Sequence, residues 1–133
     1  MVDDVVKSFS LLKELLLSWK GERKEKTDAI RKAIITVEKA TLATRAYLAR
    51  IRNKPEAAAY THESALSQLW FEAYSRCLEA GHHDLARRCQ IKAHGWVDAK
   101  IWDDPRYAGI AISLESILDS CRGITATLPK HDA

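Results

Sequence analysis

The chain has 133 residues, of which 47% are hydrophobic and 29% charged, and its formal net charge is +3. This length and composition are typical of one soluble globular domain. No stretch approaches the ~20 apolar residues of a membrane span, and the acidic start of the chain is unlike a signal peptide, so we expect a cytoplasmic protein.

The composition favours helix throughout, because Ala, Leu, Lys, Glu and Arg are abundant while only five Gly and three Pro are present. We therefore predict an all-α fold with no strand. Three cysteines, Cys77, Cys89 and Cys121, are far apart and form no C-x-x-C unit. Each falls on the apolar side of a predicted helix, which indicates small core residues.

The first predicted helix starts after Asp3 or Asp4. Its apolar residues recur at alternating spacings of four and three, the pattern of a coiled-coil seam: Val5, Phe9, Leu12, Leu16 and Trp19. Leu11 and Leu15 widen this stripe. The charged stretch 20–28 follows, and we interpret it as the turn of a helical hairpin, with a kink at Gly21 as the alternative.

A second helix is predicted from Thr27 or Asp28 to about Asn53, where Lys54 and Pro55 end it. Its seam is Ile30, Ile34, Val37, Thr41, Thr44, Leu48 and Ile51. The centre of this seam has small side chains, so bulky residues must approach it to prevent a cavity. We expect Trp70 and Phe71 to fill this role.

Three further helices are predicted. The first covers residues 55 or 61 to 80, with Leu66, Leu69, Trp70, Ala73, Cys77 and Leu78 facing inward. The next begins at Asp84 and buries Leu85, Cys89, Ala93 and Trp96. The last begins at Asp104-Pro105, a strong start signal, places Ile110, Leu114, Ile117, Leu118 and Cys121 on one face, and ends before Gly123. The predicted architecture is an antiparallel bundle of four to five helices over residues 1–123, with a loose tail over 124–133.

Arginine precedes histidine by six or seven positions in four pairs: Arg76 with His82 or His83, and Arg87 or Arg88 with His94. This spacing resembles the motif of the HEPN helical ribonucleases. The resemblance implies metal-independent RNA cleavage, in which histidine and arginine act on the ribose hydroxyl and the phosphate. The polar residue that commonly follows the arginine in that family is replaced here by Cys77, Arg88 or Cys89. We therefore assign no catalytic residue, and Arg88, His94, Arg76 and His82 are the candidates if the resemblance holds.

Residues 1–54 contain 13 Lys and Arg against 7 acidic residues, whereas the rest of the chain contains 8 against 11. A nucleic-acid contact is therefore a second hypothesis, carried by basic residues around the predicted hairpin: Arg23, Lys24, Lys26, Arg31 and Lys32. Glu79 and His82 match the Glu-x-x-His unit of di-iron bundles, but this unit occurs once where such a site needs two. We predict no metal, cofactor or small-molecule ligand.

The preferred hypothesis is a non-enzymatic interaction module that forms a homo-oligomer or binds a protein partner. It depends on the surplus of apolar residues in the first helix and on aromatic residues around residues 97–103. The predicted interface residues are Leu11, Leu15, Leu17, Trp96, Trp102 and Tyr107.

Overall fold

The structure is a computed structural model that describes the backbone of residues 2–129 and the side chains of residues 24–129. Four α-helices, α1 (Val2–Asn53), α2 (Tyr60–Glu79), α3 (His83–Val97) and α4 (Leu114–Thr127), account for most of it. Three short 3-10 helices, η1 (Pro55–Ala57), η2 (Ala99–Asp103) and η3 (Pro105–Tyr107), lie in the connections. The described residues contain no strand, which confirms the predicted all-α helical bundle.

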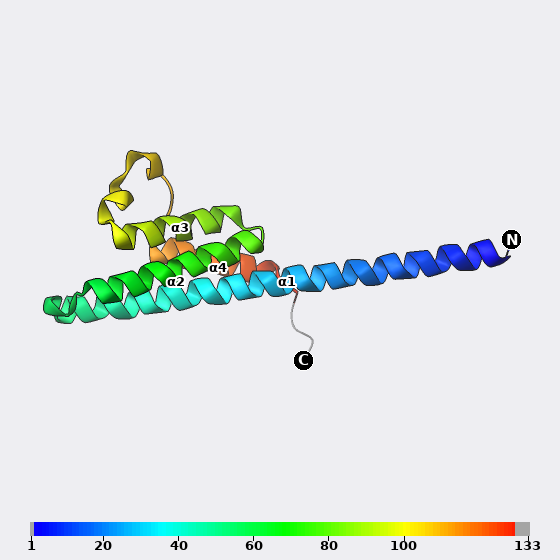
Figure 1. Ribbon diagram of the computed structural model, residues 1–133, viewed down its shortest axis with the longest axis horizontal. Helices are drawn as coiled ribbons and strands as arrows, with labels where there is room; N and C mark the ends of the chain where they lie inside the picture. The colour runs from blue at the N-terminus through cyan, green and yellow to red at the C-terminus, as the bar shows by residue number, and fades with distance from the viewer. Residues whose placement is uncertain (1, 130–133) are drawn as a thin grey trace.

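The helices form a small bundle around the second half of α1 (Figure 1). α2 returns along α1 after the turn at η1, and α3 packs on α2. α4 lies against α1. The segment that contains η2 and η3 projects from the bundle as a loop (Figure 1). None of the described helices combines the length and the apolar character that crossing a bilayer requires.

The core contains many small residues, and Trp70 is the largest of its fully buried side chains. The indole of Trp70 in α2 is fully buried against a patch of α1 that contains Val37, Ala40 and Thr44. The three cysteines are also buried, as their positions predicted. Trp70 therefore fills the gap over the small centre of the α1 seam, but Phe71 does not, because its side chain is 54% exposed.

The predicted hairpin at residues 20–28 is wrong, because α1 continues through this stretch without a break. The stretch contains no proline, and its one glycine, Gly21, costs only about 1 kcal/mol in a helix relative to alanine. The remaining residues are mainly Lys, Glu and Arg, which favour helix. Charge density here therefore indicates an exposed helical segment and not a turn.

The last helix also differs from its prediction. Pro105 begins only the single turn η3, which Asp104 caps by accepting a hydrogen bond of 2.9 Å from the amide of Arg106. Gly109 then takes a φ of +85°, and α4 starts at Leu114, where Ser113 caps it. The helix continues past Gly123 to Thr127, so Gly123 does not end it. Asp84 lies within the first turn of α3, and Leu78 is partly exposed.

Candidate functional site

Arg88, a candidate of the ribonuclease hypothesis, is held in a structural contact. Its Nη2 lies 2.9 Å from Oδ2 of Asp84, and its Nη1 donates a hydrogen bond of 2.7 Å to Oγ of Ser120 in α4. The side chain is only 19% exposed. Arg88 therefore ties α3 to α4, and its charge is already partly neutralised by Asp84.

Arg76 and His82 do not line a common cavity in the described part of the chain. Arg76 is exposed on α2, where its Nη1 lies 3.4 Å from Oε2 of Glu79. His82 precedes the first residue of α3 and lines a separate hollow together with Ser120 and Thr127 of α4. This pair therefore has the predicted sequence spacing without a shared site.

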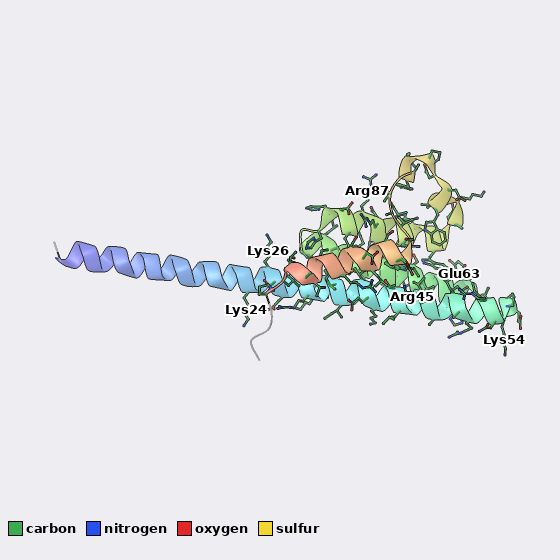
Figure 2. The ribbon with its side chains drawn as sticks, turned by 180° about the vertical axis from the view of Figure 1, so that it is seen from behind. Lys24, Lys26, Arg45, Lys54, Glu63 and Arg87 are labelled. Atoms are coloured by element: carbon green, nitrogen blue, oxygen red, sulfur yellow. The ribbon has the colours of Figure 1, made fainter. Side chains whose placement is uncertain are left out.

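Arg87 and His94 line one cavity of about 340 Å³ on the outer side of α3. His83 and Gln90 line it too, so four polar side chains follow one face of the helix at spacings of four, three and four. Figure 2 shows Arg87 on this outer side, close to the η2–η3 loop. The cavity is completed by Tyr74 and Leu78 of α2 and Tyr107 of η3.

The cavity is suited to an anion. No acidic residue lines it, and among the described residues Arg87 forms no ion pair with an acidic side chain and donates no hydrogen bond to one. A guanidinium binds phosphate oxygens through several donors, and an imidazole can donate a hydrogen bond or a proton near neutral pH. The sequence pattern found Arg87 and His94, but it gave no signal for Tyr74, which comes from another helix.

Trp96 and Trp102, two of the predicted interface residues, hold the η2–η3 loop on the bundle. Their rings form an edge-to-face pair with centroids 5.2 Å apart, and Nε1 of Trp102 donates a hydrogen bond of 3.2 Å to the carbonyl of Ile91. A Cβ atom at Gly95 would overlap the Trp102 indole, so glycine allows this close packing. Both indoles are half-buried, and their placement is explained by this loop contact.

The basic residues of the nucleic-acid hypothesis are spread along one straight helix, because the predicted hairpin is not formed. Lys24 and Lys26 are exposed where the bundle ends (Figure 2). Arg31 lies 3.9 Å from Asp28 and donates a hydrogen bond to the carbonyl of Pro129. Lys32 is exposed, and the side chain of Arg23 lies outside the described residues. The hairpin on which the nucleic-acid hypothesis depended is therefore absent from the described structure.

The first part of α1 extends alone beyond the bundle (Figure 1). Ala29 is the first described residue of α1 that packs against the core, and Lys24–Lys26 are exposed. The predicted interface residues Leu11, Leu15 and Leu17 belong to this projecting segment, and their side chains lie outside the described residues. Because the backbone is helical throughout, the sequence positions of the segment can be placed on helix faces.

No group of His, Cys, Asp and Glu side chains suited to a metal ion occurs within residues 24–129. Comparison of the chain with family models, with curated proteins and with solved structures gave no match. The two features of the described chain that bear on function are therefore the α3 cavity and the projecting segment of α1.

Proposed function

We propose that this protein is an oligomerising module, in which the projecting segment of α1 associates with a second copy of the chain. The observation that supports the proposal most strongly is that this segment has an apolar seam in sequence, while no other element in the described part of the chain lies beside it (Figure 1). Isolated helices are marginal in water and are stabilised by packing of an apolar face. A helix of this kind needs a partner.

The sequence of the segment supports pairing with another helix. Six apolar residues occupy successive a and d positions of one heptad repeat: Val2, Val5, Phe9, Leu12, Leu16 and Trp19. Such a repeat keeps a narrow stripe on one face and is buried when two or more helices pack together. A second copy of the chain supplies an identical stripe, so association buries both.

The test is the molar mass of the full chain by size-exclusion chromatography with light scattering. The 15.0 kDa chain is expected to elute as a species of at least twice that mass. Leu12→Lys, which places a charge in the seam, should convert the protein to a monomer. The bundle should remain folded in this variant. Leu42→Lys is the matched control, because Leu42 is 66% exposed on the bundle part of α1. A monomeric parent chain at all accessible concentrations would refute the proposal.

A second candidate function is binding of a phosphate group, as in RNA or a nucleotide, in the α3 cavity. The specific observation in its favour is the stripe His83, Arg87, Gln90 and His94, with Tyr107 beside it. The volume of about 340 Å³ lies at the lower end of the range for ligand sites. Of the Arg–His pairs with the predicted spacing, this candidate depends on Arg87 and His94, which line the same cavity.

The second candidate is tested by the fluorescence anisotropy of a labelled single-stranded RNA. Arg87→Gln should weaken binding about tenfold or more, because a charge-assisted hydrogen bond contributes about 1.5–3 kcal/mol. Arg45→Gln, an equal loss of charge on the exposed face of α1, is the control (Figure 2). Equal weakening in both variants would show non-specific charge attraction. Cleavage of the RNA in EDTA that disappears in His94→Ala would extend this candidate to ribonuclease chemistry.

A further inference from the structure

The heptad register of the projecting segment continues into the part of α1 that is buried in the bundle. Counting by alternating steps of four and three from Trp19 gives Arg23, Lys26 and Ile30, and then the buried positions Ala33, Val37, Ala40, Thr44 and Tyr47. Trp19 and Ala33 are 14 residues apart. On a straight helix these two positions therefore differ in direction around the axis by only about 40°. The end of the seam at Trp19 and the buried position Ala33 therefore lie on the same side of α1.

This common side constrains how a second copy can dock. In a parallel pair the two α1 helices would run together past Ala29, but the face that they share is covered there by each chain's own α2 and α4. The two bundles would therefore compete for the space between the helices. In an antiparallel pair residues 2–19 of the two chains run past each other and the two bundles lie at opposite ends of this stretch, so both seams can be buried.

One antiparallel register pairs all six seam positions with apolar residues. In this register residue i of one chain faces residue 21 − i of the other, so that Val2 faces Trp19, Val5 faces Leu16 and Phe9 faces Leu12. Arg23 and Lys26, the two charged residues at seam positions, lie outside the stretch 2–19 that this register pairs.

Charge along the segment agrees with the antiparallel arrangement. Asp3 and Asp4 lie near the start of the segment and Lys20 follows its end, while residues 20–28 hold four basic residues against three acidic ones. In the register described, the acidic end of one helix lies within about one turn of the partner's Lys20, and the two helix dipoles oppose each other favourably. A parallel pair would place Asp3 and Asp4 of one chain beside Asp3 and Asp4 of the other.

We infer that two copies of this chain form a two-fold symmetric dimer through antiparallel pairing of α1 residues 2–19, with the two bundles at opposite ends of the shared rod. The inference rests on the proposed self-association and adds its direction and register. The dimer contact is isologous, since each seam faces its own copy, and such a contact closes without growing into a filament. Both α3 cavities remain open at the two ends.

The direction of pairing is tested by electron–electron distance measurement between nitroxide labels on the full chain. Lys24→Cys and Leu11→Cys are labelled separately; Leu11 flanks the seam and Lys24 lies beyond it, so neither label replaces one of the six seam residues. The native thiols at Cys77, Cys89 and Cys121 are buried and should not be labelled. Leu11 is close to the two-fold axis, so its labels should lie about 20 Å apart. Lys24 labels should lie about 40 Å apart or more, from 27 residue steps at ~1.5 Å.

Each outcome bears on a different claim. A short distance at Leu11 with a long one at Lys24 establishes antiparallel pairing. Similar short distances at both positions would show parallel pairing, which overturns the inference and leaves self-association standing. A monomeric mass with no dipolar signal at either position would overturn the proposed function as well. Circular dichroism of each labelled chain, compared with that of the unlabelled parent, shows that α1 remains helical.

Discussion

The indole Nε1 of Trp70 donates a hydrogen bond of 2.9 Å to Oγ1 of Thr44, and both side chains are buried between α2 and α1. The Thr44 hydroxyl donates in turn to the carbonyl of Ala40 at 2.7 Å. The large side chain that fills the core is thereby also fixed in orientation. This contact explains why a hydroxyl occupies the centre of the α1 seam.

Thr44→Val should destabilise the bundle by about 1–3 kcal/mol, because it leaves the buried Trp70 N–H without an acceptor while keeping the side-chain volume. Urea denaturation followed by circular dichroism measures the change. Thr41→Val is the control, since Thr41 is equally buried and its hydroxyl donates only to Val37 of the same helix. That variant should be close to neutral. Equal losses in both variants would contradict a special role for the Trp70 contact.

Gly95→Ala should detach the η2–η3 loop from α3, because the new Cβ atom would overlap the Trp102 indole. We expect the steric conflict to lower the free energy of unfolding by about 1–3 kcal/mol. The higher helix propensity of alanine should offset part of this decrease. A red shift of tryptophan fluorescence would report the exposure of Trp102. Gly123→Ala in α4 is the matched control, because nothing lies within 4 Å of its Cβ position, and it should stabilise the protein by about 0.5–1 kcal/mol. An unshifted spectrum in Gly95→Ala would contradict this account.

Much of the fold could be predicted from the sequence, because hydrophobic periodicity is a local property. The all-α fold, the end of α1 at Asn53 and the burial of Trp70 and the cysteines follow from apolar spacing and from Pro55. The unbroken path of α1 through residues 20–28 could not be predicted, since a run of charged residues without a core contact is compatible with either a turn or an exposed helix.

The candidate site was predictable only in part. The spacing of Arg87 and His94 was visible in sequence, but so were three similar pairs, and only tertiary packing separates them. Arg88 is turned toward Ser120 of α4, whereas Arg87, one residue earlier, faces the cavity. A rotation of about 100° per residue on a helix decides this difference, and the sequence does not state which face α4 covers.

Arg88→Gln should destabilise the protein by about 1–3 kcal/mol, because it removes the contacts to Asp84 and Ser120 that join α3 to α4. Arg87→Gln, the neighbouring substitution, should change stability by less than about 0.5 kcal/mol, since Arg87 is exposed. Thermal denaturation of the two variants measures the contrast. If the two substitutions destabilise equally, the distinction between a structural and a free arginine is wrong.

Burial of the thiols should make stability fall at alkaline pH. Burial raises the pKa of Cys121 to about 12, helped by the nearby Cys77 and by Glu38, whereas an unfolded thiol titrates near 8.5. The folded state thus keeps a proton that the unfolded state releases. The contribution of this thiol to the free energy of unfolding is therefore complete below pH ~8.5 and declines as the pH rises toward 12. The expected slope is about 1.4 kcal/mol per pH unit for this group. Urea denaturation at pH 8–10 should give a shallower decline in Cys121→Ala than in the parent chain, and identical slopes would show that the Cys121 thiol is not the group responsible.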